Sequence, residues 1–190
     1  MRDTDMADYS GLGLLVVDMQ PAFLAACTSP SRVLSRVRFA IRAAELLGIQ
    51  VFFSEQVPEK LGKTVEELLE FSDGPVFPKS AFSALRAPEI DSYLDEESFS
   101  HLLLTGIETP ICIYQTALDA LARDLQVTLL SDAIGQRRDQ DVPQVLQTLR
   151  EAGCNILPSE TVFYSIIASS FHADFREFSD LVKEAQLTSA

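Results

Sequence analysis

The sequence predicts a single α/β domain in which a mostly parallel sheet carries helices on both faces. Short apolar runs alternate with longer amphipathic segments along the 190 residues. The apolar runs are continuous, which indicates strands buried on both faces, and regular strand–helix alternation is typical of parallel sheets. We find no linker, internal repeat or low-complexity tract, so we expect one domain over residues 1–190.

Six short apolar runs are the expected strands: 13–17, 50–54, 76–79, 101–106, 127–131 and 155–157. Helices are expected between and after them, at 30–47, 64–71, 88–97, 110–124, 142–152, 163–171 and 175–185. Pro30, Pro88 and Pro110 suit first helical turns, because proline lacks the N–H that would be unsatisfied there. Gly48 and Gly153 follow helical runs, as glycines at helix C-termini do.

Composition excludes several classes of partner. The formal net charge of −13 argues against nucleic acid and anionic membranes, since both require a basic surface. Three widely spaced cysteines, Cys27, Cys112 and Cys154, fit a reducing compartment better than a disulfide framework. Residues 1–10 lack a signal-peptide pattern, and no apolar stretch reaches transmembrane length. We therefore expect a cytoplasmic protein.

Three chemically capable residues follow or end expected strands. Asp18 follows 13–17, Lys79 ends 76–79, and Cys112 comes shortly after 101–106. Open parallel sheets bind ligands beyond the carboxyl ends of their strands, so these side chains should meet at one edge. Taken singly, each has an ordinary alternative: a turn aspartate, a solvated lysine and a small core cysteine. Together they favour a functional site.

Cys112 should lie in the first turn of a helix. Thr109 is a suitable N-cap and Pro110 a suitable first residue, which places the cysteine near free N–H groups and the positive end of the helix dipole. Such a setting lowers the pKa of a thiol. We therefore expect iodoacetamide at mildly acidic pH to modify Cys112 faster than the other two cysteines.

A cysteine nucleophile needs a base, and the histidines are poorly placed to serve. His101 opens a strand at the opposite end from the site, and His172 lies in a C-terminal amphipathic stretch. Asp18 could act instead if desolvation raises its pKa, with Lys79 keeping the site near neutrality. On this hypothesis, Asp18→Asn should slow both alkylation and turnover of any substrate.

The ordered set of motifs resembles the isochorismatase-like cysteine hydrolases. The matching segments are LVVDMQPAF at 15–23, FPKSAF at 77–82, GIETPICI at 106–113, QTALD at 115–119 and SDA at 131–133. The resemblance covers about residues 12–170. It implies a three-layer, Rossmann-like fold with six parallel strands.

The resemblance also implies the chemistry. Asp18, Lys79 and Cys112 would form a catalytic triad, and a cis peptide at Ile107–Glu108 would aim the N–H groups of Glu108 and Cys112 at an oxyanion. The implied activity is hydrolysis of a small-molecule amide, ureide or related C–N bond through a thioester-type intermediate, with no cofactor. A homo-oligomer, dimer or larger, is implied too; Leu181 and Val182 are candidate interface residues.

The loop after the second strand separates this chain from nicotinamidase-like members, which carry an Asp-x-His metal site there. Here residues 54–62 contain no histidine, and Glu55 with Glu59 makes a poor transition-metal site, so we predict no metal. The loop instead resembles the Glu-Gln-x-Pro-x-x-Leu-Gly segment of the isochorismatase-domain-containing subgroup. Isochorismate is disfavoured as substrate because Cys112 is present, and the substrate is left unidentified.

Five residues are candidates for the substrate pocket: Phe23, Gln56, Phe82, Tyr114 and Tyr164. Phe23 and Phe82 could equally pack the core. The alternative function is a non-catalytic interaction or scaffold protein that retains the hydrolase fold. A redox role through a sulfenic acid ranks lower, because no resolving cysteine lies near in sequence. A dinucleotide-binding enzyme is disfavoured, because no glycine-rich turn follows the first strand.

Overall fold

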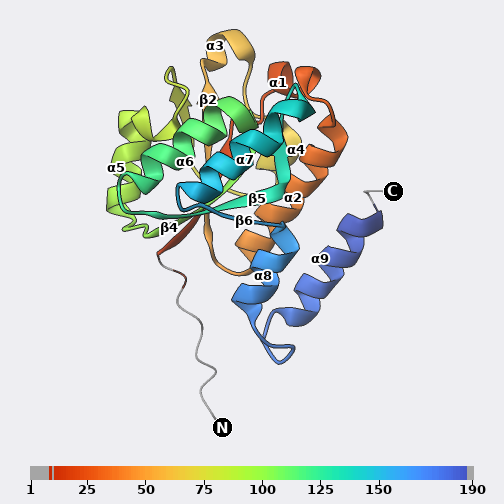
Figure 1. The fold of residues 1–190 in the computed structure, drawn as a ribbon. Helices are drawn as coiled ribbons and strands as arrows, with labels where there is room; N and C mark the ends of the chain where they lie inside the picture. Colours follow the sequence, from red (N-terminus) through yellow and green to blue (C-terminus); the bar gives the residue numbers. More distant parts are fainter. Residues whose placement is uncertain (1–8, 10, 188–190) are drawn as a thin grey trace.

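A central sheet of six strands organises the protein (Figure 1). The computed structural model describes residue 9 and residues 11–187. Its strands are β1 (Leu12–Val17), β2 (Gln50–Gln56), β3 (Val76–Lys79), β4 (His101–Ile107), β5 (Gln126–Gly135) and β6 (Asn155–Leu157). They run in the order β3-β2-β1-β4-β5-β6, and every pairing is parallel. The predicted α/β class with six parallel strands is confirmed. The expected signal-free start, residues 1–10, lies outside the described residues except for Tyr9.

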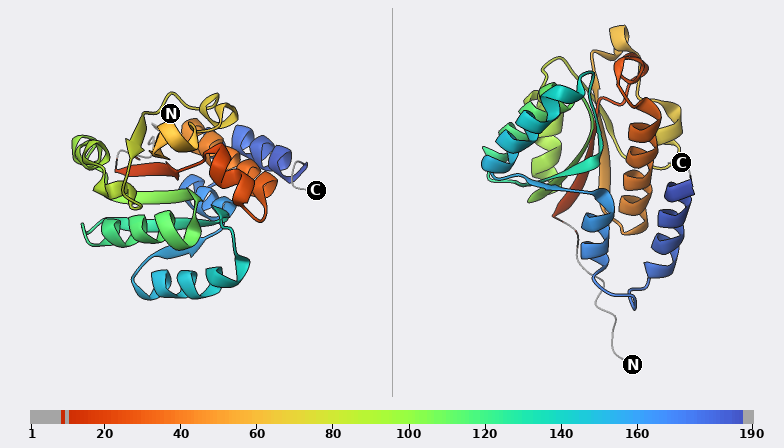
Figure 2. Two further views of the ribbon diagram at one scale, coloured as in Figure 1. Left: turned by 90° about the horizontal axis from the view of Figure 1, so that it is seen from above. Right: turned by 45° about the vertical axis from the view of Figure 1, so that its right-hand side comes forward.

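Helices cover both faces of this sheet (Figure 2). The helices are α1 (Pro21–Ala26), α2 (Pro30–Leu46), α3 (Pro58–Leu61), α4 (Glu66–Leu69), α5 (Pro88–Glu96), α6 (Tyr114–Leu121), α7 (Val142–Glu151), α8 (Ser159–Ile167) and α9 (Phe175–Leu187). Helices α2, α4, α8 and α9 pack on one face, whereas α5, α6 and α7 pack on the other. Three short turns complete the set: η1 (Ala84–Arg86), the π-helical η2 (Thr109–Ile113) and η3 (Asp139–Asp141).

Side chains of the continuous apolar strands belong to two hydrophobic cores, one on each face of the sheet. Leu14 and Val16 of β1 belong to the cluster under α2, and Leu15 and Val17 belong to the cluster under α5 and α6. Successive side chains of a strand point to opposite faces, so a strand covered on both sides must be apolar throughout. Burial on both faces therefore explains why the strands appear in the sequence as uninterrupted apolar runs.

The strand order reverses at the centre of the sheet. From β1 the chain moves outward to β2 and β3, and then returns to add β4 on the other side of β1. The loops after β1 and β4 therefore diverge at their carboxyl ends, which leaves a crevice at this switch point. Both loops carry candidate residues, Asp18 and Cys112.

Several helix boundaries differ from the prediction. The segment expected at 163–171 begins earlier, at Ser159, and ends at Ile167 because Ala168 adopts a left-handed conformation with φ of +56°. The segment expected at 64–71 shortens to α4. Helices α1 and α3 were not predicted; with six and four residues they are too short to show helical periodicity.

Helix α9 packs along α2, and this packing corrects one expectation. Leu181 and Val182 are 9% and 6% exposed, because both join the core cluster beneath α2. They are therefore intramolecular core residues and do not supply an interface for a second copy. The homo-oligomer stays a prediction. No helix in the described part of the chain has the length and apolarity needed to cross a membrane.

Gly106 of β4 lies directly against β1, next to the candidate site. Its φ is +115°, and a Cβ placed on it would stand 2.1 Å from the carbonyl oxygen of Val17, its register partner. Only glycine fits there, because any side chain would collide with backbone that cannot yield. Gly48, which follows α2 as expected, also has a positive φ, +68°, but a Cβ there would meet nothing within 4 Å.

These two glycines allow a matched test of the steric constraint. We expect Gly106→Ala to lower the free energy of unfolding by about 3 kcal/mol or more, since strain and collision add. Gly48→Ala should lower the free energy of unfolding by about 1 kcal/mol, because it adds only the strain of an alanine in the left-handed conformation. Urea unfolding monitored by circular dichroism measures both values. Equal losses for the two variants would contradict the close approach of β4 to β1.

Candidate functional site

Asp18 occupies the end of β1 and is completely buried. Its φ of +50° turns the chain away from the strand, while its N–H donates to the carbonyl oxygen of Ser54 at 3.0 Å. The Ser54 hydroxyl donates to Asp18 Oδ1 at 2.8 Å. Ser54 can do so because β1 and β2 pair in parallel, with Val17 opposite Ser54. The carboxylate is thereby held in one orientation.

Lys79 supplies the opposite charge. Its Nζ lies 2.7 Å from Asp18 Oδ2, and both side chains are 0% exposed. The ammonium also donates to Gln56 Oε1 at 2.6 Å and to the carbonyl oxygens of Ala81 and Phe82 at 3.2 and 3.1 Å. Four oxygens therefore surround a cation that water does not reach. A buried ion pair is stable only when its remaining hydrogen-bonding capacity is satisfied in this way.

Gln20 and Gln56 hold the strand ends together. Gln20 Oε1 accepts the N–H of Gln56 at 2.7 Å, and its Nε2 donates to the carbonyl oxygens of Gln56 and Gly62. Gln56 lies opposite Lys79 in the sheet, and its Nε2 donates to the carbonyl oxygen of Ser80 at 2.8 Å. Sequence reasoning missed Gln20 and Ser54. The signal available was a polar residue at the end of each apolar strand run.

Cys112 lies on η2, immediately after β4. Its Sγ is 3.8 Å from Lys79 Nζ, and it is hydrogen-bonded to the Asp18 carboxylate and to the backbone N–H of Glu108. The peptide bond between Ile107 and Glu108 is cis. Asp18, Lys79 and Cys112, which are far apart in sequence, are therefore in mutual contact. The sequence placed them at one edge of the sheet, and the structure brings them together there.

The expected N-cap is wrong. Thr109 is the first residue of η2, and its hydroxyl makes no cap. It donates instead to the carbonyl oxygen of Gly135 at 2.9 Å, which ties η2 to the end of β5. Thr109 is completely buried, so its hydroxyl needs a buried acceptor, and the β5 carbonyl provides one.

The expectation of a lowered thiol pKa is also wrong. The pKa of Cys112 is raised to about 12, chiefly by burial; the Asp18 charge also raises it, by more than the Lys79 charge lowers it. Desolvation of a thiolate at 3% exposure therefore outweighs the dipole of a short turn. Burial also raises the pKa of Asp18, against the lowering effect of Lys79. The free site thus holds its proton on sulfur, beside a carboxylate whose proton affinity is increased.

A cavity of about 460 Å³ opens onto Cys112. Its walls come from α1, the end of β2, α3, the loop after β3, the turn from β4 into η2, and the loop after β5. The lining residues are Ala22, Phe23, Ala26, Gln56, Leu61, Phe82, Glu108, Ile111, Cys112 and Arg137. Three of the five predicted pocket residues, Phe23, Gln56 and Phe82, are among them. Tyr114 instead packs against the α5–α6 core, and Tyr164 of α8 packs edge-on against Phe178 with ring centroids 4.9 Å apart.

The other candidate groups lie in ordinary structural settings. His101 Nε2 contacts the Thr128 hydroxyl at 2.8 Å, and burial lowers the pKa of this histidine. His172 is next to Asp174 in the loop before α9. Glu55 accepts the N–H of Thr64 at 2.6 Å. Within residues 11–187 no group of three or more His, Cys, Asp and Glu side chains is arranged to hold a metal ion.

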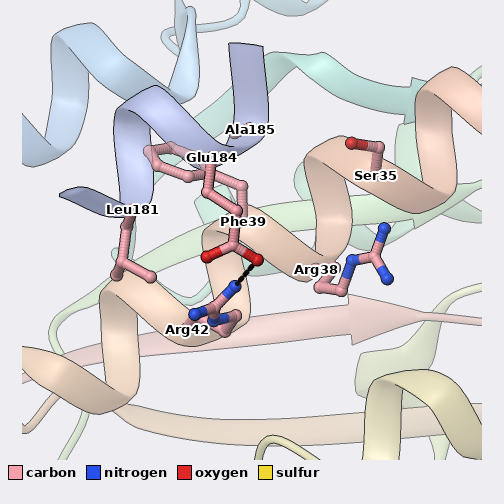
Figure 3. A pocket seen from close by; sticks show the side chains of 7 residues that line it. All are labelled: Ser35, Arg38, Phe39, Arg42, Leu181, Glu184 and Ala185. Carbon is pink, nitrogen blue, oxygen red and sulfur yellow. Dashed lines mark hydrogen bonds and ion pairs between the residues drawn. The ribbon is translucent and has the colours of Figure 1, made fainter. Parts of the chain in front are cut away.

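A second hollow separates α2 from α9 (Figure 3). Its volume is about 80 Å³, well below the roughly 300 Å³ at which ligand sites begin. Arg42 Nη1 of α2 reaches across this hollow to Glu184 Oε1 of α9 at 2.6 Å, so these two charged side chains pair with each other. It lies on the far side of α2 from the sheet, and none of the triad residues lines it.

Comparison with known proteins matches most of the chain. The sequence model of the isochorismatase domain matches residues 13–161. Isochorismatase domain-containing protein 1 of Danio rerio is 35% identical over 87% of this chain. The match covers 59% of the length of that relative. Isochorismatase domain-containing protein 2A of Mus musculus is 34% identical over 90% of this chain and 82% of the relative.

Solved structures resemble the fold closely. The MAR1 ribonuclease of Caenorhabditis elegans has a TM-score of 0.85 and 29% identity, covering 92% of this chain and 91% of that one. The YcaC gene product of Escherichia coli, described as an octameric hydrolase of unknown specificity, has a TM-score of 0.76 over 98% of this chain and 99% of its own. At 16% identity, YcaC shows the shared fold alone.

The pKa of Cys112 reverses the expected effect of Asp18→Asn on alkylation. Asparagine removes the charge and the hydrogen bond that raise the thiol pKa, while Lys79 continues to lower it. The thiolate fraction should therefore increase, by about tenfold for each unit of pKa lost. We expect Cys112 in the variant to react faster with iodoacetamide at neutral pH, as measured by mass spectrometry.

The pH profile provides the check. Between about pH 6 and pH 10 the wild-type rate should keep rising, because a pKa near 12 leaves the thiol protonated throughout, whereas the Asp18→Asn rate should level off earlier. Asp119→Asn is the matched control: Asp119 of α6 is partly buried, pairs with Arg86 and does not line the cavity, so this variant should follow the wild-type curve. A slower Asp18→Asn rate at every pH would refute the assignment.

Proposed function

The chain belongs to the isochorismatase domain family, and from this premise we propose that it is a cysteine hydrolase of a small-molecule amide, ureide or related C–N bond. One observation carries the proposal: Cys112 borders a cavity of small-molecule size while touching a buried carboxylate and a buried ammonium. A thiol, a base and a fixed positive charge are the groups that acyl transfer requires.

In the first half-reaction the Cys112 proton moves to Asp18, and sulfur attacks the carbonyl carbon of the substrate. The carbonyl π electrons move onto oxygen, where the N–H groups of Glu108 and Cys112 stabilise the negative charge. Collapse of this intermediate breaks the C–N bond, and the leaving nitrogen takes the proton from Asp18. A thioester on Cys112 and a free amine result.

Water completes the cycle. Asp18, again a carboxylate, accepts a proton from water as the oxygen attacks the thioester carbon. Collapse then breaks the C–S bond, and the proton returns from Asp18 to the sulfur. Two features support this role for Asp18: its pKa is raised toward that of the thiol, and it contacts both the thiol and Lys79.

Lys79 acts as a permanent electrostatic partner in this scheme. Its Nζ already donates to Asp18, Gln56 and two backbone carbonyls, so it has no free proton position for the substrate. Its charge offsets the negative charge as that charge passes between Asp18 and Cys112. Gln56 therefore serves as a positioning residue for Lys79, in addition to lining the cavity.

Ribonuclease activity is the second possibility, because the similar Caenorhabditis elegans protein carries that description. The net charge of −13 weighs against it, since the phosphates of a polynucleotide would be repelled. A cavity of about 460 Å³ also suits a small molecule better than a strand. We therefore favour the small-molecule hydrolase.

The test is a turnover screen of amides, carbamoyl compounds, lactams and esters, followed by variants. For any substrate found, Cys112→Ala, Asp18→Asn and Lys79→Met should each lower kcat/KM by at least about 10²-fold. Intact-mass spectrometry of quenched reactions should show an acyl adduct on Cys112. Asp119→Asn should keep wild-type turnover.

Retained turnover in Cys112→Ala would exclude the cysteine as nucleophile. Cleavage of an RNA oligonucleotide without amide turnover would favour the ribonuclease. A folded protein that turns over no compound in the screen, and that retains a stable protein partner in pull-downs, would favour the non-catalytic scaffold.

A further inference from the structure

Arg137 lines the same cavity as Cys112 and is held there by Glu108. Its Nε donates to both carboxylate oxygens of Glu108, at 3.0 and 2.9 Å, and its backbone N–H donates to Glu108 Oε1 at 3.2 Å. Gln136, the preceding residue, is fixed by Asp139, whose Oδ1 accepts from its Nε2 at 2.7 Å. These hydrogen bonds hold the Arg137 side chain in one position, although the residue lies in the loop after β5.

The terminal nitrogens of Arg137 have no partner among the described residues. Glu108 uses only Nε and the backbone N–H, so both Nη groups are left over, on a side chain that is 49% exposed. Among the other polar side chains of the lining, Glu108 is paired with Arg137, and Gln56 is hydrogen-bonded to Lys79 and Ser80. Most of the remaining wall is apolar, with Phe23 and Phe82 as its largest members.

The Nη edge of a guanidinium is a planar pair of charged donors, which matches a carboxylate with two parallel hydrogen bonds. Glu108 lies between the guanidinium and the reaction centre. Its backbone N–H contacts Cys112, and its carboxylate orients Arg137. A molecule small enough for the cavity can thus place a carbonyl at the sulfur and an anion at the arginine.

We propose that Arg137 binds a substrate carboxylate, and that the substrate class is therefore amides or ureides that carry a carboxylate group. This inference rests on the hydrolase function proposed above. Because Glu108 offsets the formal charge of Arg137, recognition rests on the two Nη donor groups that Glu108 does not use. The apolar walls accommodate the carbon skeleton between the two polar ends.

The experiment compares anionic and neutral alkylating reagents at Cys112. Iodoacetate is paired with iodoacetamide, and N-iodoacetylglycine with its glycinamide, so the carboxylate stands at two distances from the reacting carbon. The readout is the ratio of anionic to neutral alkylation rates at Cys112, measured by peptide mass spectrometry and referred to glutathione. The thiol pKa cancels in this ratio, because both reagents of a pair attack the same thiolate.

In at least one pair, the ratio at Cys112 should exceed that of glutathione by about tenfold, the effect of one bidentate charge-assisted contact. Arg137→Gln should reduce it to the glutathione value, and Arg137→Lys should retain part of it. Arg138→Gln is the matched control: Arg138 pairs with Asp141, does not line the cavity, and should leave the ratio unchanged.

Two other outcomes separate the claims. If Cys112 reacts with the neutral reagents but shows the glutathione ratio in both pairs, or keeps a raised ratio in Arg137→Gln, the carboxylate site is refuted and the hydrolase proposal stands. If Cys112 in the native protein reacts with none of the four reagents, the claim that Cys112 is an accessible nucleophile is refuted, and the inference about its substrate is refuted with it.

Discussion

The ion pair between Asp18 and Lys79 is the interaction on which the site depends. Each charge is removed from water at a cost of several kcal/mol, and the pair is stable because Ser54, Gln56 and two backbone carbonyls complete its hydrogen bonding. Losing one partner of such a pair costs about 3–5 kcal/mol, since the other charge is then buried alone. The strand order β3-β2-β1 therefore has to bring these two residues together before the site can exist.

The same pair determines where the thiol proton resides. A cysteine at a helix start is normally acidified, but Cys112 is buried next to a carboxylate, and both influences raise its pKa. The site is consequently electrically balanced while empty: one ammonium, one carboxylate and one neutral thiol. Activation then consists of moving one proton over a single contact, from sulfur to Asp18, without creating net charge inside the protein.

The sequence was sufficient for the sheet and for the three central residues, because both follow from local patterns. Continuous apolar runs revealed strands buried on two faces, and polar residues at their ends revealed which side chains converge. Ser54 and Gln20 carry the same signal of a polar residue near a strand end, but their hydrogen-bond partners could not be predicted, since these depend on which strands pair and in which register. The sign of the Cys112 pKa shift was missed for a related reason: burial is a property of the assembled fold, whereas the helix start is visible in the sequence. Arg137 lies in the loop after β5, where no pattern indicates that its side chain reaches the cavity.

The central claim is that the resting site stores a proton on the sulfur of Cys112. Infrared difference spectroscopy of the free protein at neutral pH tests this directly, because a thiol has an S–H stretching band that a thiolate lacks. We predict that wild-type protein shows an S–H band that disappears in Cys112→Ser and weakens in Asp18→Asn. If the wild-type and Cys112→Ser spectra are identical in this region, Cys112 is already a thiolate, and the account of the site is contradicted.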